Sequence, residues 1–316
     1  MQQGTTAGRT DYSISIDESD AGSHFPPADA ADSWQESWFL VWYDPVHAIG
    51  GYHHVSFRRV LGLADVTQWL ARDGVVCQKL VQTGIPIPPG DLSEFSIGPA
   101  AVRTLDPLRA YALTCAGRSP DDIGLDLRYD AYAPLPVAYH LDRAGIQTGA
   151  GHYDSHGRVT GTARVGERTL RIDAFARHDH SWGNRDFGSL TGYRLVRVGL
   201  GPDLYVSAST IDSVRGHAEF GFVAEDGVVR QIAACRIEPR AGVAGSTGYD
   251  IRAWTEDGRG YRFDCDRLDV ADEWVQGTRF IRAGFGTFAS GGRMGGGMLE
   301  IGSVGTRHAD SPELRH

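Results

Sequence analysis

Segments with alternating apolar and polar residues, separated by tight turns, run through most of this chain. The clearest pairs flank Asp73-Gly74, Asp226-Gly227 and Asp257-Gly258, and further hairpin turns are expected at Gly166-Glu167 and Gly291-Gly292. Asp-Gly favours two-residue hairpin turns because both central residues of such a turn need a positive φ. A period of two is typical of half-buried strands, and no window carries a 3.6-residue apolar stripe of helical length. The sequence therefore predicts an all-β protein built from antiparallel hairpins.

The number of strands and the length of the chain indicate two β units. Many short strands joined by regular turns are typical of β-barrels and β-sandwiches. The 316 residues are enough for two domains of about 150 residues each. We expect an N-terminal β domain over residues 33–183 and a C-terminal β domain over residues 184–306, because Gly183, Asn184 and Gly188 interrupt the strand pattern. Residues 1–32 read as a flexible N-terminal segment and residues 307–316 as a polar tail.

Charge and motif content argue against several classes of protein. The net charge is −9 and Lys79 is the only lysine, so the chain lacks the basic run that a phosphate backbone would need. No stretch approaches the ~20 apolar residues of a membrane helix, and the N-terminus lacks a signal-peptide core. We therefore expect no nucleic-acid partner, no membrane span and a cytoplasmic location. The four cysteines form no C-x-x-C pair and are expected to be free thiols. Rossmann, phosphate-loop, serine-hydrolase and zincin motifs are absent from the sequence.

The densest group of chemically active side chains is the segment Arg177-His178-Asp179-His180-Ser181-Trp182-Gly183-Asn184-Arg185-Asp186. In the strand before it, the even-numbered residues from Leu170 to Ala176 form an apolar face. With a period of two, His178 and His180 continue this inward face, whereas Asp179 faces the other side. We therefore expect two imidazoles to point into an apolar barrel at the end of this strand.

The sequence Asp-His-Ser-Trp-Gly at residues 179–183 resembles the Asp-His-x-Trp-Gly signature of a double lipocalin-like superfamily. That superfamily includes carotenoid 1,2-hydratases, kievitone-type prenyl hydratases and fungal lipocalin-like Diels–Alderases. Weaker matches lie at His152–Gly161, Glu36–Phe39 and Gly292–Glu300, so the resemblance spans residues 34–303. It implies two lipocalin-like β-barrel or sandwich domains packed together, and cofactor-free chemistry on hydrophobic, often isoprenoid, substrates.

We interpret the motif as the centre of an acid–base site. Hydration of an alkene needs an acid that protonates carbon, a base that positions water, and a site that tolerates a carbocation. A buried Asp, or a His beside a carboxylate, can be the acid, and aromatic faces stabilise the cation. The catalytic candidates are Asp179, His180, His178 and Arg185. The substrate-binding candidates are Trp182, Trp38, Trp42, Tyr43, His53, His54 and Tyr139, and two further acid candidates are Glu36 and Asp44.

Residues 38–43 form a segment that is apolar on both strand faces. A strand of this kind is buried on both sides, which suits the contact between two barrels. The adjacent His53 and His54 are expected to face opposite sides of their strand.

Three functions stay open from the sequence. The first, which we expect, is a cofactor-independent lyase or isomerase that hydrates, dehydrates or cyclises a double bond in a hydrophobic small molecule. The second is a non-catalytic lipocalin-like binder of such a molecule. The third is a metal enzyme in which His178 and His180 gain a third ligand, because zinc requires three or four. The candidates for that ligand are His53, His54, His140 and His152. No bound metal is expected under the first reading, and a homodimer stays open.

Overall fold

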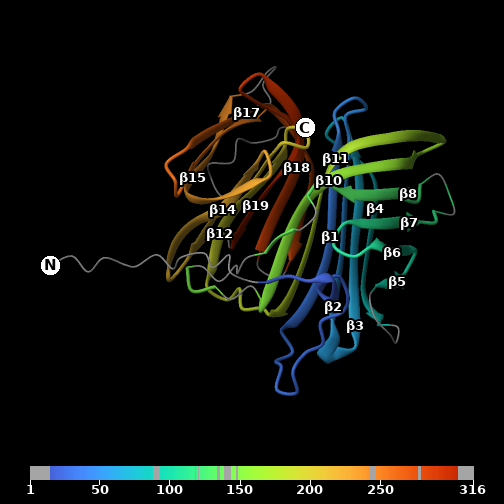
Figure 1. The fold of residues 1–316 in the computed structure, drawn as a ribbon. Helices are drawn as coiled ribbons and strands as arrows, with labels where there is room; N and C mark the ends of the chain where they lie inside the picture. Colours follow the sequence, from blue (N-terminus) through green and yellow to red (C-terminus); the bar gives the residue numbers. More distant parts are fainter. Residues whose placement is uncertain are drawn as a thin grey trace.

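The computed structural model describes residues 15–87, 93–117, 119, 121–133, 136–138, 144–146, 149–241, 247–276 and 279–304, with the side chains of residues 269–280 excepted. Within these ranges, helix is limited to two 3₁₀ turns, η1 (Glu18–Ala21) and η2 (Arg59–Leu61). The other regular elements are strands, arranged as two curved sheets side by side (Figure 1). The prediction of an all-β protein is confirmed. The same ranges contain no helix with the length and apolar character needed to span a bilayer.

The first sheet takes its strands from the N-terminal half of the chain. They are β1 (Trp34–Asp44), β2 (Ile49–Arg58), β3 (Leu63–Arg72), β4 (Val75–Pro86), β5 (Glu94–Ile97), β6 (Ala100–Asp106), β7 (Ala110–Cys115), β8 (Gly124–Ala131), β9 (Val137–Ala138), β10 (Gly151–Val165) and β11 (Arg168–Asn184). Their order is β4-β3-β2-β1-β11-β10-β8-β7-β6-β5, with β9 paired to β10. The sheet curls around an apolar core, in which Phe57 of β2 meets Phe95 of β5 edge to face with ring centroids 5.2 Å apart. This contact brings the end strand β5 close to β2, which lies near the opposite end of the sheet order.

The second sheet is a closed antiparallel barrel. Its strands are β12 (Leu190–Gly199), β13 (Leu204–Ser213), β14 (Gly216–Glu225), β15 (Val228–Ala241), β16 (Thr247–Thr255), β17 (Gly260–Gln276), β18 (Arg279–Ser290) and β19 (Arg293–Val304). Consecutive strands pair, and β19 also pairs with β12 to close the ring. Alternate residues such as Val196, Val206 and Phe263 fill its interior. The residues between them face outward, and some of these face the first sheet.

The expected hairpin turns occur where the sequence placed them, although at Asp257-Gly258 only the glycine has a positive φ. Asp73 and Gly74 between β3 and β4 have φ values of 52° and 77°, and Asp226 and Gly227 between β14 and β15 have values of 51° and 76°. A positive φ at both positions matches the twist of the flanking strands. The turn between β18 and β19 uses two glycines with φ values of 56° and 82° for the same reason.

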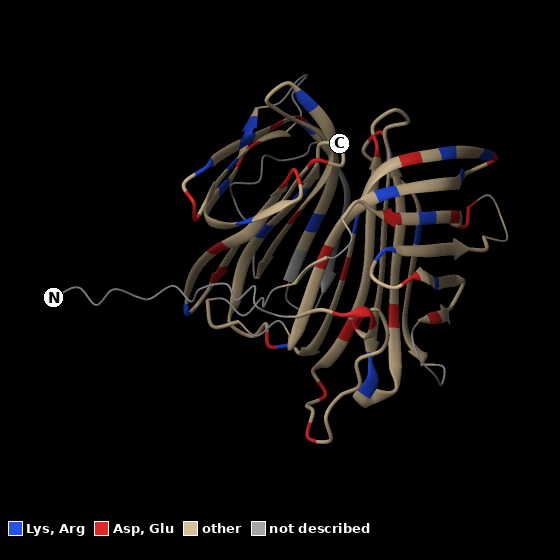
Figure 2. Ribbon diagram, in the orientation of Figure 1, with Lys and Arg blue, Asp and Glu red and all other residues tan. Residues whose placement is uncertain are grey.

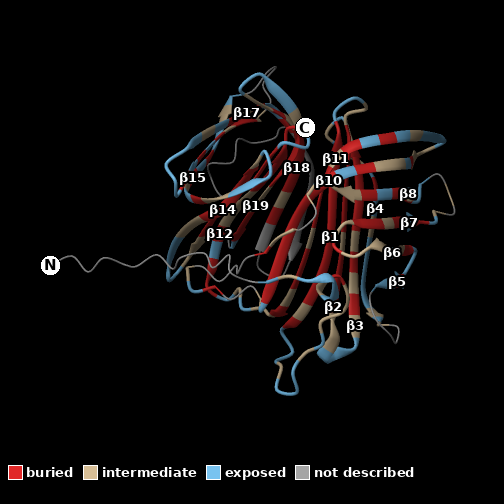
Figure 3. Cartoon of the chain, viewed as in Figure 1, coloured by how far each residue is buried: buried red, intermediate tan, exposed pale blue. Residues whose placement is uncertain are grey.

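Strand β1 lies at the contact between the two sheets and is buried on both faces. Trp38 and Trp42 point into the core of the first sheet. Phe39 and Tyr43 point the other way, into an apolar cluster that includes Phe285 of β18. Figure 3 shows buried residues concentrated along the strands that face one another. The prediction of a two-sided apolar strand between two barrels is confirmed.

Glycine allows the two sheets to approach closely. A Cβ atom on Gly50 of β2 would lie 2.3 Å from the ring of Phe285, and one on Gly199 of β12 would lie 1.7 Å from the ring of Phe175. Both distances are far below van der Waals contact, so a larger residue at either position would push the sheets apart. The close approach at these two glycines sets the distance between the sheets, and so the width of the space between them elsewhere.

Candidate active site between the barrels

A cavity of about 430 Å³ lies between the outer faces of the two sheets. Its apolar wall includes Phe39, Tyr52, Ile146, Phe187, Leu190, Leu195, Ile211, Phe220, Ile281 and Met298. Its polar groups include Asp179, Arg177, His152, His54, Arg185, Arg197, Ser209, Tyr193 and Glu300. The first sheet supplies residues from β1, β2, β10 and β11, and the second supplies residues from β12, β13, β14, β18 and β19. The cavity therefore depends on the packing of the two sheets together.

The period-two geometry of β11 divides the Arg177–Asp186 segment between two environments. β11 pairs with β1 and β10 without a register shift through Trp182, so no bulge alters the alternation. Arg177, Asp179 and Ser181 face the cavity. His178 and His180 face the interior of the first sheet, as the sequence predicted. The Asp179 carboxylate and the imidazoles of His178 and His180 thus lie on opposite sides of the sheet.

Asp179 is an ionised carboxylate held by a cation and an imidazole. It forms an ion pair with Arg177, and its Oδ2 lies 3.1 Å from Nε2 of His152 on β10. Burial alone would raise the pKa of Asp179, but Arg177 and His152 outweigh it and hold that pKa well below its usual range. Asp179 is therefore charged throughout the neutral pH range and fixes the orientation of the His152 ring.

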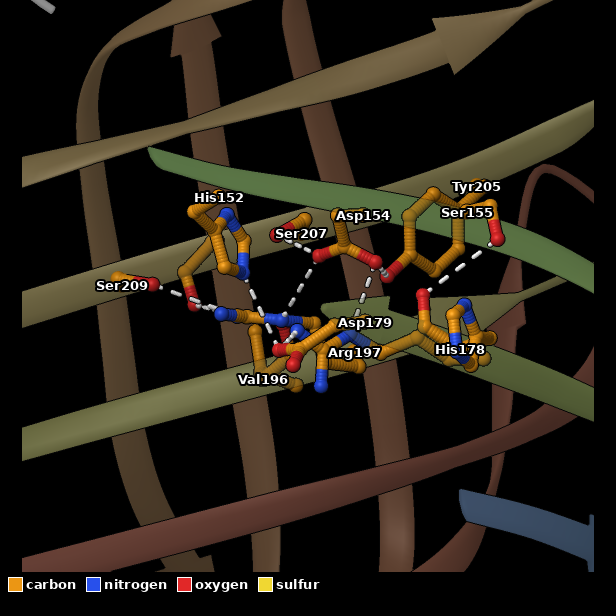
Figure 4. A network of polar contacts seen from close by, with 12 residues as sticks. His152, Asp154, Ser155, His178, Asp179, Val196, Arg197, Tyr205, Ser207 and Ser209 are labelled. Atoms are coloured by element: carbon orange, nitrogen blue, oxygen red, sulfur yellow. Dashed lines mark hydrogen bonds and ion pairs between the residues drawn. The ribbon is translucent and has the colours of Figure 1, made fainter. Parts of the chain in front are cut away.

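A buried ion-pair network joins the two sheets beside the cavity (Figure 4). Asp154 of β10 accepts hydrogen bonds at Oδ1 from Arg177 Nε at 2.8 Å and from the Tyr205 hydroxyl at 3.1 Å. Its Oδ2 accepts from the Ser207 hydroxyl at 3.2 Å and lies 3.5 Å from Arg197 Nε. Asp154 is fully buried, and three of these partners belong to the second barrel. The network therefore ties the cavity-lining face of the first sheet to the second barrel.

Glu300 of β19 carries a half-buried carboxyl group on the opposite wall. The Tyr193 hydroxyl donates to its Oε1 at 2.9 Å. Burial raises the pKa of Glu300, and the negative charge of Asp179 raises it further, although Tyr193 and nearby arginines act in the other direction. The pKa values of Glu300 and Asp179, which face the same cavity, are therefore shifted in opposite directions.

Two further predicted residues line the cavity. Burial lowers the pKa of His54 on β2 to about 4, so its imidazole is neutral at physiological pH. Arg185 donates from Nη2 to the Ser181 hydroxyl at 2.9 Å. Acidic and basic residues are interspersed on both barrels (Figure 2), and the half-buried His54 and Arg185 belong to the group that faces the cavity.

His180 and His178 occupy a separate polar cluster inside the first sheet. Nε2 of His180 lies 3.0 Å from Oε1 of Glu36, and its Nδ1 lies 3.3 Å from the Tyr153 hydroxyl. His178 is stacked on Tyr111 with ring centroids 4.4 Å apart, and neither of its ring nitrogens has a hydrogen-bond partner among the described residues. Burial holds the pKa of His178 well below its usual value. Neither imidazole is among the residues that line the cavity.

The structure brings only some of the sequence candidates together. Asp179, Arg185 and His54 line the cavity. His180, His178, Glu36, Trp38, Trp42 and His53 face the interior of the first sheet, where Trp42 Nε1 donates to His53 Nε2 at 2.9 Å. Three other candidates also lie away from the cavity lining. Tyr43 stacks on Phe285 with ring centroids 5.8 Å apart, and Trp182 stacks on His24 with ring centroids 3.4 Å apart. The Asp44 carboxylate lies 2.7 Å from His47 Nδ1. His53 and His54 face opposite sides, as expected. Tyr139 and His140 lie outside the described residues.

Sequence reasoning missed the residues that complete the cavity. Glu300 was noticed only as the end of a glycine-rich match, and Arg177 only as part of the motif. For His152 the sequence indicates only a weak family match, at residues 152–161, and a candidate metal ligand. A carboxylate between Leu299 and Ile301 in a predicted strand is the signal that would have identified Glu300, because a charged residue in an apolar strand needs a buried partner. Tyr193 and Asp154 carried no comparable signal.

Two barrel-like sheets packed face to face, with a cavity between them, define the double lipocalin-like class. Two solved structures are similar to this chain in fold. Kievitone hydratase from Nectria haematococca matches with a TM-score of 0.58 and 13% identity over 88% of this chain and 91% of that chain. CghA, solved with Sch210972, matches with a TM-score of 0.54 and 11% identity over 88% and 90%. The resemblance expected from residues 179–183 is confirmed at the level of the fold.

The family follows from the sequence. Residues 17–304 match the family described as "Domain of unknown function (DUF7064)", and the chain belongs to this family. No curated protein matches the sequence.

Proposed function

We propose that this protein is a cofactor-independent lyase or isomerase that hydrates, dehydrates or cyclises a double bond in a hydrophobic small molecule, such as an isoprenoid. The reaction takes place in the cavity between the barrels. The observation that supports this most strongly is the pair of unlike carboxyl groups there: Glu300, whose pKa is raised, and Asp179, whose pKa is lowered. Two titratable groups whose environments push their pKa values apart are typical of acid–base catalysis.

Glu300 is the proposed acid. Its Oε1 accepts the Tyr193 hydrogen bond, which leaves the other oxygen to carry the proton toward the substrate. Transfer of that proton to one alkene carbon leaves a carbocation at the other carbon and a carboxylate on Glu300. A raised pKa increases the protonated fraction of Glu300 at a given pH, which favours its role as the acid.

His152 is the proposed base, and Asp179 is its positioning partner. Water adds through its oxygen to the carbocation, and His152 takes the proton that the water loses. The ion pair between Asp179 and Arg177 keeps the carboxylate charged, so it stabilises the imidazolium that forms. Proton exchange with solvent then restores His152 and Glu300, and dehydration uses the same groups in reverse. Asp179 therefore acts through His152, and this proposal replaces the expected role of His180.

The apolar wall is suited to the proposed substrate class. The volume of about 430 Å³ falls within the ~300–1,000 Å³ that small-molecule sites usually have. The rings of Phe39, Tyr52 and Phe220 line this space and provide faces that stabilise a cation. The occurrence of the same fold in a protein named as a hydratase supports a hydration reaction.

Native mass spectrometry of the protein purified from its own cells tests whether the cavity holds such a molecule. We expect a bound small molecule on the wild type and its loss in Leu195→Trp, because Leu195 lines the cavity and a tryptophan there would fill it. Val229→Trp, at an exposed position of the same barrel, is the matched control and should keep the ligand. Equal occupancy in all three proteins would place the ligand elsewhere.

Catalysis is tested with the molecule thus identified. Glu300→Gln and Asp179→Asn should still bind it but lose turnover about 10²–10⁴-fold, the usual contribution of a general acid or base. Because the acid must be protonated, wild-type turnover should fall as the pH rises through the raised pKa of Glu300. A ligand that the wild type binds without converting would instead assign the protein as a binder. Full turnover in both variants would overturn the proposed roles.

A further inference from the structure

Three side chains of metal-ligating type converge on the face of β1 and β11 that lies away from the cavity. They are His24 from the segment before β1, Glu36 of β1 and His180 of β11, and their ligand atoms all lie within 4.8 Å of one another. The Glu36 side chain is fully buried, that of His180 is 3% exposed and that of His24 is 16% exposed. The cluster is therefore an enclosed one, unlike acidic groups on a surface.

The distances within the cluster suit a single divalent ion. Oε1 of Glu36 lies 3.1 Å from Nδ1 of His24 and 3.0 Å from Nε2 of His180. Two ligand atoms that each lie ~2.1 Å from one tetrahedral ion are ~3.4 Å apart, so binding needs these two distances to lengthen by only a few tenths of an ångström. Imidazole and carboxylate together are ligands that zinc and similar transition metals accept.

The outer nitrogen of each imidazole already has an oxygen partner. His24 Nε2 lies 3.1 Å from Oδ1 of Asp20, and His180 Nδ1 lies 3.3 Å from the Tyr153 hydroxyl. A histidine that binds a metal typically donates its other ring N–H to such an oxygen, which fixes the tautomer and the ring orientation. With the protons on the outer nitrogens, both inner nitrogens present lone pairs to the same point beside Glu36.

The surroundings hold the ligands in place. His24 stacks on Trp182 with ring centroids 3.4 Å apart and an angle of 7° between the rings. The second oxygen of Glu36 accepts from Arg59 Nε at 2.8 Å, which orients the carboxylate so that Oε1 faces the imidazoles. Because these contacts already hold the ring of His24 and the carboxylate of Glu36 in place, a metal can bind with little movement of its ligands.

We propose that His24, Glu36 and His180 bind one divalent transition-metal ion, Zn²⁺ being the best match to this donor set. Three protein ligands leave a fourth position for water. The ion fastens the segment before β1 to the first sheet, because His24 belongs to that segment while the other two ligands belong to the sheet. Its role is structural and is independent of the catalysis proposed for the cavity on the opposite face.

Cobalt is the probe for this site, because it occupies zinc sites and its visible absorption reports coordination. The full-length protein, treated with a chelator and dialysed, is titrated with Co²⁺ and then with Zn²⁺. We expect one equivalent of Co²⁺ to give an absorption band that Zn²⁺ removes. His24→Ala should lose the band while keeping the far-ultraviolet circular dichroism of the wild type, because His24 lies outside the sheets.

His217→Ala is the matched control. His217 also lies between two carboxylates, those of Asp212 and Glu219, but it is half exposed and uses both ring nitrogens on them. This variant should retain the cobalt band. Zn²⁺ should also raise the thermal midpoint of the wild type and of His217→Ala but not that of His24→Ala. Absence of a band in the wild type, or an equal band in His24→Ala, would overturn the proposal.

Discussion

Replacement of Asp154 tests whether the buried network holds the two barrels together. Asp154→Asn keeps the shape of the side chain but removes the charge that faces Arg177 and Arg197 and that accepts from Tyr205 and Ser207. The Asp154 and Arg177 side chains are 0% and 4% exposed, so water replaces little of the lost interaction. Breaking one partner of a buried ion pair costs about 3–5 kcal/mol. We expect a value near the lower end, because Arg177 keeps its pair with Asp179.

The assay is urea-induced unfolding, followed by tryptophan fluorescence and by circular dichroism. Asp173→Asn is the control, because Asp173 lies on the adjacent strand and pairs with Arg158 where both side chains are more than half exposed. Exposed pairs of this kind contribute about 0–1 kcal/mol. Tyr205→Phe should be destabilising alone and less so in the Asp154→Asn background, because the hydroxyl then loses its charged acceptor. Equal unfolding midpoints for Asp154→Asn and Asp173→Asn would refute this reasoning.

Two further predictions concern the stability of the fold. Gly199→Ala should destabilise the protein by about 1–3 kcal/mol through contact with Phe175, whereas Gly192→Ala on the same strand, where the nearest atom would be 3.5 Å away, should have a small effect in the same urea assay. Burial lowers the pKa of His53 from 6.5 to about 3, so the folded protein keeps this imidazole neutral while the unfolded chain protonates it below pH 6.5. The stability that the neutral form contributes is therefore complete above pH 6.5. It is lost as the pH falls below 6.5, by up to about 1.4 kcal/mol per pH unit. The free energy of unfolding of His53→Gln should therefore depend less steeply on pH between about 6.5 and 5 than that of the wild type, and an unchanged slope would contradict the assignment.

The fold was accessible from the sequence because its determinants are local. A hairpin needs only a turn that accepts positive φ and two alternating flanks, and Asp226-Gly227 satisfies both within a few residues. The two-sided burial of residues 38–43 and the opposite directions of His53 and His54 also follow from a period of two. The closing of the second barrel through β19 and β12 could not be predicted in this way, because it depends on pairing between segments about 100 residues apart.

The site was only partly accessible because it is made by contact between the sheets. Alternation correctly separated Asp179 from His180, but it could not tell which face of β11 would border a cavity. The assumption that the inward face carries the chemistry directed attention to His180. The raised pKa of Glu300, which supports its proposed role as the acid, comes from desolvation and from the charge of Asp179, and both depend on the packing of β19 against β11. A side chain whose pKa is shifted by a tertiary contact leaves no local pattern in the sequence.

Solvent deuterium incorporation tests the central claim, that Glu300 protonates carbon in the cavity, most directly. The molecule that co-purifies with the protein, or its alkene precursor, is incubated with the enzyme in D₂O, and the product is analysed by mass spectrometry and NMR. The account predicts one deuterium bound to carbon next to the new C–O bond, formed by the wild type and lost with Glu300→Gln. Product formed without deuterium on carbon, or labelled equally by Glu300→Gln, would contradict it.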